Sequence, residues 1–97
     1  MKTSSGSTAL VTGATTGIGR AIALQLAAEG AEVIVPGRSA RRGQEVVAEI
    51  AANGGLARFV GADLSDSREV ERLAREAGNV DILINNAGIY RSYRLRR

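Results

Sequence analysis

The sequence has no cysteine and no histidine among its 97 residues. Without cysteine the chain forms neither a disulfide nor a thiolate metal site, and without histidine it lacks the commonest general base and metal ligand. No metal site is therefore expected. No apolar run reaches the ~18 residues of a membrane-spanning helix, and the N-terminal residues turn polar too soon for a signal peptide. The lack of a membrane-spanning run and of a signal peptide predicts a soluble cytoplasmic protein.

Excess positive charge is confined to the C-terminal end. The whole chain carries +3, yet residues 1–90 hold nine basic and ten acidic side chains, and the last seven residues hold four arginines. We therefore divide the chain into a domain over residues 1–90 and a basic tail over residues 91–97. Binding of nucleic acid by this tail is the weaker interpretation, because only Tyr90 and Tyr93 accompany the arginines and no recognition helix is predicted.

Apolar residues follow two periods that alternate along the chain. Four short runs rich in Val and Ile, bounded by Gly, Asp or Asn, have the length of strands. Three longer segments between them repeat apolar residues every three or four positions, which is typical of amphipathic helices. The order βαβαβαβ predicts an α/β fold with a parallel sheet covered by helices. The expected strands lie at 9–11, 33–35, 59–60 and 82–84, and the expected helices begin near 18, 40 and 65, the last with Ser65 as its cap.

The stretch TGATTGIG lies between the first strand and the first helix. It places Gly13, Gly17 and Gly19 where a dinucleotide-binding fold uses glycine to turn tightly and to let the backbone approach a pyrophosphate. The N–H groups at the helix start attract phosphates, and Thr15 and Thr16 add hydroxyl donors. No Lys-Ser or Lys-Thr follows the glycines, which excludes a Walker loop. Taken alone, the pattern also fits a glycine-rich turn that binds nothing.

The end of the second strand indicates the type of nucleotide. In dinucleotide folds a carboxylate there bonds the ribose 2′-hydroxyl of NAD, whereas an arginine accommodates the 2′-phosphate of NADP. Here the strand ends in Pro-Gly, followed by Arg38 and Ser39, with no acid. Because a guanidinium binds phosphate and a carboxylate repels it, we predict NADP rather than NAD as the cofactor. Arg41 and Arg42 are interpreted as solvated residues of the helix start.

Two later motifs, ADLSD after the third strand and VDILINNAG along the fourth, complete a pattern that resembles the short-chain dehydrogenase/reductase family over about residues 8–90. The resemblance implies a Rossmann-like parallel sheet in the order 3-2-1-4. It also implies that Asp63 and Leu64 lie beside the adenine and that the Asn-Asn-Ala-Gly element lines the cofactor ribose. The predicted cofactor-binding residues are Gly13, Thr15, Thr16, Gly17, Ile18, Gly19, Arg38, Ser39, Asp63, Leu64, Asn86, Ala87 and Gly88.

The family's catalytic residues lie beyond this pattern. The resemblance implies hydride transfer between NADP(H) and a carbonyl or alcohol, using a Ser, an Asn and a Tyr-x-x-x-Lys pair that all follow Asn-Asn-Ala-Gly. The only lysine here is Lys2. Arginine does not replace lysine, which excludes the two pairs that mimic the spacing, Tyr90 with Arg94 and Tyr93 with Arg97. We therefore predict no catalytic residue in this chain and interpret it as the truncated cofactor-binding half of an oxidoreductase.

The incomplete fold leaves one alternative open. The fourth strand is apolar throughout and is expected to form an exposed edge of the sheet, where a further strand should pair. In this alternative the chain is a non-catalytic nucleotide-binding module that completes its sheet with a second copy of itself or with another chain.

Overall fold

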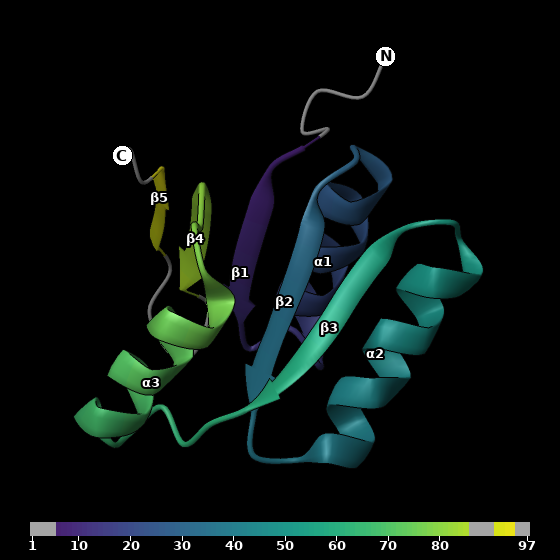
Figure 1. Cartoon of the computed structure of the whole chain (residues 1–97). Helices are drawn as coiled ribbons and strands as arrows, with labels where there is room; N and C mark the ends of the chain where they lie inside the picture. The colour runs from purple at the N-terminus through teal and green to yellow at the C-terminus, as the bar shows by residue number, and fades with distance from the viewer. Residues whose placement is uncertain (1–5, 86–90, 95–97) are drawn as a thin grey trace.

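The computed structural model describes residues 6–85 and 91–94. Strands and helices alternate as far as the fourth strand, as the hydrophobic pattern predicts (Figure 1). Each predicted element is present, and the third strand is longer than its apolar run. The elements are β1 (Thr8–Thr12), α1 (Gly17–Ala28), β2 (Glu32–Gly37), α2 (Ala40–Ala52), β3 (Leu56–Gly61), α3 (Ser67–Ala77), β4 (Ile82–Asn85) and β5 (Arg91–Arg94).

The strands form one sheet in the order β3-β2-β1-β4-β5. The first four strands are parallel, so the predicted order 3-2-1-4 and the Rossmann-like class are confirmed. Central β1 pairs with β2 from Thr8 opposite Glu32 and with β4 as far as Thr12 opposite Asn85. The carboxyl ends of these strands therefore meet at one edge of the sheet.

The prediction that the fourth strand forms an exposed edge of the sheet is wrong, because a fifth strand pairs with it. β5 pairs antiparallel with β4, with Asn85 opposite Arg91 and Ile82 opposite Arg94, so β4 is an inner strand. β5 lies within the segment that the charge pattern assigns to a basic tail. Its sequence RSYR has no Val or Ile run. A strand at an edge can form without one, since backbone pairing holds it and charged side chains are tolerated there.

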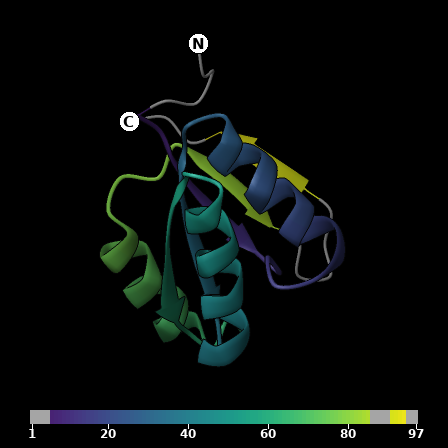
Figure 2. The ribbon, with the colours of Figure 1, turned by 90° about the vertical axis from the view of Figure 1, so that its right-hand side faces the viewer.

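Helices lie on both faces of the sheet (Figure 2). On one face, Val11 and Val33 pack with Ala23 of α1 and Val46 of α2. On the other face, Leu73 of α3 packs in a second core with apolar residues of β1, β2 and β3, namely Leu10, Ile34 and Val60. None of the helices in the described ranges is long and apolar enough to cross a membrane.

Gly43 shows how closely α2 approaches the sheet. A Cβ atom at this position would lie 2.1 Å from Cδ1 of Phe59 on β3, far inside van der Waals contact. The same ring lies within 4 Å of the Cβ positions of Gly37 and Gly61. The helix pattern alone presents Gly43 as a weak point of the first turn, whereas the structure shows that glycine admits the ring of Phe59.

Replacing Gly43 with alanine is expected to lower the free energy of unfolding by about 1–3 kcal/mol, as overpacking does. Helix propensity alone favours alanine by about 1 kcal/mol and predicts the opposite sign. In a Phe59→Ala background the substitution should become stabilising, because the blocking ring is gone. Urea unfolding of the single and double variants measures both effects. Stabilisation by Gly43→Ala with Phe59 present would contradict this packing.

Candidate functional site

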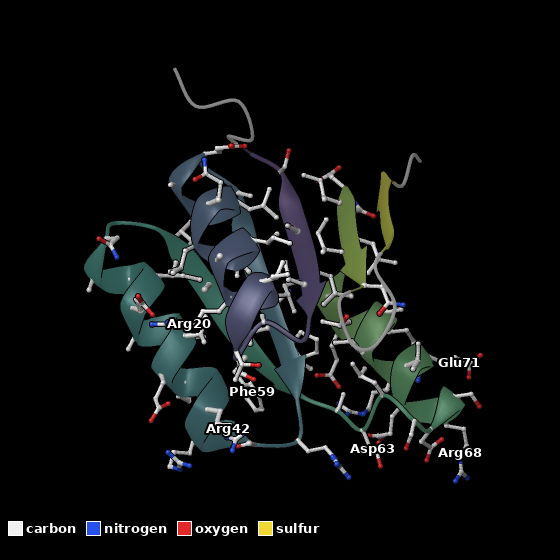
Figure 3. All side chains as sticks on the ribbon, turned by 180° about the vertical axis from the view of Figure 1, so that it is seen from behind. Arg20, Arg42, Phe59, Asp63, Arg68 and Glu71 are labelled. Carbon is white, nitrogen blue, oxygen red and sulfur yellow. The ribbon has the colours of Figure 1, made fainter. Side chains whose placement is uncertain are left out.

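A cleft of about 470 Å³ lies where the carboxyl ends of β1, β2 and β3 meet. We call it the strand-end cleft. Figure 3 shows two of its residues, Arg42 and Asp63, at the end of the molecule toward which the parallel strands point. Open parallel sheets bind ligands at this end. The lining residues are Gly13, Ala14, Thr15, Pro36, Gly37, Arg38, Ser39, Arg42, Ala62, Asp63, Leu64 and Ser65.

The turn after β1 requires glycine at two positions. Gly13 and Gly17 have φ of 64° and 57°, a left-handed conformation that other residues adopt at a cost. Apart from the adjoining residues and the backbone of α1, no atom of the described residues lies within 4 Å of the Cβ position of Gly17, so the space in front of the turn is open. The predicted residues Thr15, Thr16 and Gly17 line a neighbouring hollow of about 350 Å³.

The start of α1 carries backbone donors without a side-chain cap. Thr16 is the N-cap residue but its side chain makes no capping hydrogen bond, and the first turn contains no acid. The N–H of Arg20 is the first to bond back, to the carbonyl of Thr16 at 3.3 Å. The N–H groups of the three residues before it have no acceptor within the helix. An anion fits this helix start, since the helix dipole and the N–H groups both favour negative charge.

Arg38 and Ser39 follow β2 at the rim of the strand-end cleft. Ser39 is the N-cap of α2, and its Oγ accepts from the N–H of Arg42 at 3.2 Å. The hydroxyl proton of Ser39 remains able to donate to a ligand. Arg38 is exposed, and its guanidinium makes no hydrogen bond or ion pair with the described residues. Both predicted residues thus present donors to the cleft.

Asp63 presents a negative charge to the same cleft. Its Oδ1 accepts from the hydroxyl of Ser65 at 2.7 Å and from the N–H of Ser65 at 3.0 Å. These two bonds, followed by the positive charge of Arg38, lower the pKa of Asp63. Ser65 therefore orients Asp63 and does not cap α3. The N-cap is Asp66, whose carboxylate accepts from the N–H of Arg68 at 2.9 Å, so the predicted Ser65 cap is wrong by one residue.

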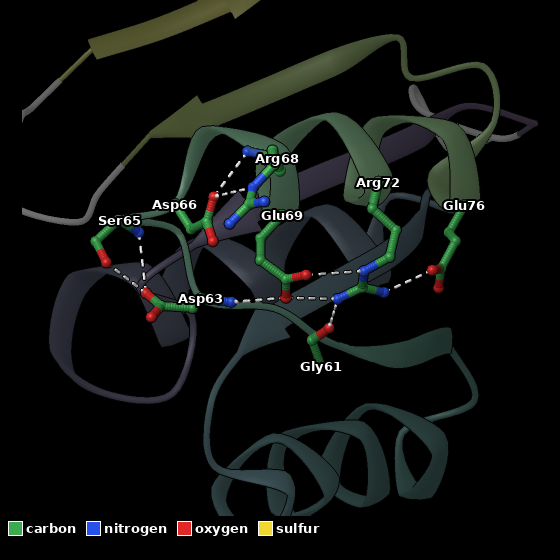
Figure 4. Close-up of polar contacts among 8 residues, drawn as sticks. All are labelled: Gly61, Asp63, Ser65, Asp66, Arg68, Glu69, Arg72 and Glu76. Atoms are coloured by element: carbon green, nitrogen blue, oxygen red, sulfur yellow. Dashed lines mark hydrogen bonds and ion pairs between the residues drawn. The ribbon is translucent and has the colours of Figure 1, made fainter.

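Arg72 connects α3 to the end of β3 by hydrogen bonds, next to Asp63 (Figure 4). Its guanidinium donates to Glu69 at 2.8 Å, to Glu76 at 2.5 Å, and to the carbonyl of Gly61. Glu69 in turn accepts from the N–H of Asp63 at 3.4 Å. The hydrogen bond from Arg72, and then the one from Asp63, lower the pKa of Glu69. The network fixes the backbone that carries Asp63, and no motif in the sequence indicates it.

The end of β4 is held to β1 by side-chain hydrogen bonds. The hydroxyl of Thr12 donates to Oδ1 of Asn85 at 3.1 Å and to the carbonyl of Ile84 at 3.4 Å. Asn85 is the first residue of the Asn-Asn-Ala-Gly element. The remaining predicted residues of this element, Asn86, Ala87 and Gly88, lie outside the described residues.

The other predicted residues differ in their surroundings. Ile18 is exposed and Gly19 is buried, and neither lines the strand-end cleft. Leu64 lines both this cleft and an apolar hollow of about 400 Å³ on the α3 face. Arg42 was interpreted from the sequence as a solvated residue, but it lines the cleft. Its position one helical turn after Ser39 could have indicated this, because residues three apart lie on the same side of a helix. Within 6–85 and 91–94, no cluster of three acids could hold a metal ion.

Comparison with known proteins places these features in one family. The family model described as short chain dehydrogenase matches residues 7–96. A 3-oxoacyl-[acyl-carrier-protein] reductase from Synechocystis sp. is 47% identical over 94 residues, which cover 92% of this chain and 38% of that protein. A 3beta-hydroxysteroid dehydrogenase from Mediterraneibacter gnavus is 46% identical over 84 residues, covering 82% of this chain and 30% of that protein.

A solved structure is similar in fold to most of this chain. The crystal structure of a 3-oxoacyl (acyl-carrier-protein) reductase from Agrobacterium tumefaciens C58 with NADP bound matches with a TM-score of 0.76 and 42% identity. The match covers 87% of this chain and 34% of that one. The present chain spans about a third of the length of the curated relatives. Since the family model extends over nearly all of its residues, the chain belongs to the short-chain dehydrogenase family.

Proposed function

We propose that the strand-end cleft binds NADP(H), as the cofactor site of an oxidoreductase. The observation that carries this proposal is the convergence of three strand ends, which brings Gly13, Arg38 and Asp63 into one cleft. These residues come from three separate motifs, and each has the chemistry that a different part of a dinucleotide needs. A glycine-rich turn that binds nothing would not require the other two motifs at the same cleft.

The chain's own groups fit the cofactor part by part. The open space at Gly17 and the N–H groups at the start of α1 suit the pyrophosphate. Asp63 stays ionised because Ser65 holds one of its oxygens, and Oδ2 is left to accept from the adenine amine. When bound, NADP(H) supplies or accepts the hydride. The residues of this chain bind and orient the cofactor.

The choice of NADP over NAD rests on the end of β2. No carboxylate lies there to accept from a ribose 2′-hydroxyl, and Arg38 with the Ser39 hydroxyl can donate to a 2′-phosphate. The relative from Agrobacterium, whose structure has NADP bound, supports the same choice.

Hydride transfer to or from a carbonyl or alcohol is the activity we propose for the whole protein. Reductases and dehydrogenases among the relatives support this reaction class. The sequence predicts no catalytic residue between 1 and 97, so the reaction requires groups that this chain does not provide. A non-catalytic module that completes its sheet with a partner chain is the alternative, but β5 already pairs with the edge of β4 that this alternative needs. A cytoplasmic location remains a prediction.

Replacing Gly17 with alanine is expected to weaken NADPH binding by about tenfold, because a methyl group then occupies the space that the pyrophosphate needs. Gly54→Ala is the matched control: Gly54 also has positive φ and open space at its Cβ position, but it follows α2 at the far end from the cleft. Both variants should lose about 1–2 kcal/mol of stability from left-handed strain. Titration of NADPH fluorescence measures the Kd. Equal Kd values for the two variants would contradict the site.

Replacing Arg38 with aspartate is expected to reverse the nucleotide preference. The Kd of NADPH should rise roughly 10- to 100-fold, since a hydrogen bond to a charged group contributes about 1.5–3 kcal/mol, while binding of NADH should hold or improve. Arg75→Asp changes the net charge equally, but Arg75 lies on α3 and does not line the cleft. Calorimetric titration with both nucleotides separates the variants. Parallel loss of NADH and NADPH affinity in Arg38→Asp would argue against the proposed preference.

A further inference from the structure

Two arginines of the strand-end cleft form no ion pair with a described carboxylate, unlike most of the other described arginines. Within residues 6–85, five arginines form ion pairs with carboxylates. Arg38 and Arg42 line the cleft and form no ion pair with the described residues, and the same holds for Arg75, which lies away from the cleft. The paired arginines are Arg20 with Glu49, Arg41 with Glu45, Arg58 with Glu32, Arg68 with Asp66, and Arg72 with Glu69 and Glu76.

Arg42 decides the sign of the charge at the cleft. The charged side chains among the lining residues are Arg38, Arg42 and Asp63. Asp63 and Arg38 carry opposite charges and line the same cleft, so a ligand near both experiences little net charge from this pair. The guanidinium of Arg42 makes no hydrogen bond or ion pair with a carboxylate in the described part of the chain. A net positive charge in the cleft therefore depends on Arg42.

The position of Arg42 offers no structural reason for a cation. It lies in the first turn of α2, where the helix dipole mildly disfavours positive charge, and no acid in that turn compensates. Its backbone N–H caps the helix through Ser39 at 3.2 Å, so any residue other than proline would serve as well. Arg41, one position earlier, pairs with Glu45 at 3.2 Å and does not line the cleft. The two neighbouring arginines thus have different surroundings.

We propose that Arg42 is a specificity-determining residue, which binds the 2′-phosphate of NADP(H) together with Arg38 and the Ser39 hydroxyl. The inference rests on the proposed function, because it assigns a ligand group to one part of the same cleft. Two guanidiniums and a hydroxyl match a dianionic phosphate with several acceptor oxygens. NADH lacks this phosphate, so Arg42 contributes to the affinity for NADPH alone.

The test compares Arg42→Gln with Arg41→Gln in the full 97-residue chain. Both substitutions remove one positive charge from adjacent helix positions, and both keep the backbone N–H that caps α2. Calorimetric titration with NADPH and NADH gives the Kd of each nucleotide. Arg42→Gln should raise the Kd of NADPH about tenfold and leave that of NADH unchanged, whereas Arg41→Gln should change neither by more than about twofold. Arg42→Lys, which keeps the charge, should recover part of the loss.

The outcomes separate this inference from the proposed function. Equal NADPH affinity in Arg42→Gln and Arg41→Gln, with NADPH still bound tightly, overturns the role of Arg42 and leaves the cofactor site intact. Failure of the unaltered chain to bind either nucleotide overturns the proposed function and the inference with it. An equal loss of NADH and NADPH affinity in Arg42→Gln overturns the specificity role. Thermal melting of each variant shows whether such a loss reflects unfolding, and the Arg42→Lys variant then decides the question.

Discussion

The central strands of this sheet must bury both of their faces, and the rest of the structure depends on that constraint. Successive residues of a strand point to opposite faces. Val11 belongs to the core under α1 and α2, while Leu10 belongs to the core under α3. The inner residues of β1 and β2 can therefore be apolar on both faces only if helices cover the sheet on both sides. A parallel sheet with long crossover helices satisfies this requirement, and it also brings the carboxyl ends of the strands to one edge.

The strand-end cleft follows from that arrangement, but its side chains are held by local interactions. The bond from Arg72 to the carbonyl of Gly61 fixes the end of β3 against α3, and Glu69 fixes the N–H of Asp63. Ser65 then orients the carboxylate of Asp63. On the other side, Ser39 caps α2 and sets the direction in which the helix leaves the cleft. Hydrophobic burial thus positions the strands, and hydrogen bonds at their ends position the polar groups.

Much of this fold could be predicted from the sequence, because its elements differ in hydrophobic period and β1 to β4 carry Val and Ile runs. The position of the glycine turn, Arg38 and Asp63 at strand ends could likewise be predicted from short motifs, whereas their role in binding a cofactor stays a prediction. β5 could not be predicted, because backbone pairing holds it and RSYR carries no apolar pattern. The contact of Gly43 with Phe59 was also hidden, since it joins residues 16 apart through a close approach of helix and sheet.

The local electrostatic potential at the cleft depends on which arginines form ion pairs, and not on the net charge of the chain. Residues 1–90 carry slightly more acids than bases, a balance that gives no reason to expect an anion site. Most of the described arginines in that range, however, form ion pairs with carboxylates of the same or a neighbouring element, which offset their charges over short distances. Among the described residues neither Arg42 nor Arg38 has such a partner, and Asp63 is the acid that lines the same cleft. A chain that is nearly neutral over this range can therefore present a local positive potential at one cleft, which is the quantity an anionic ligand responds to.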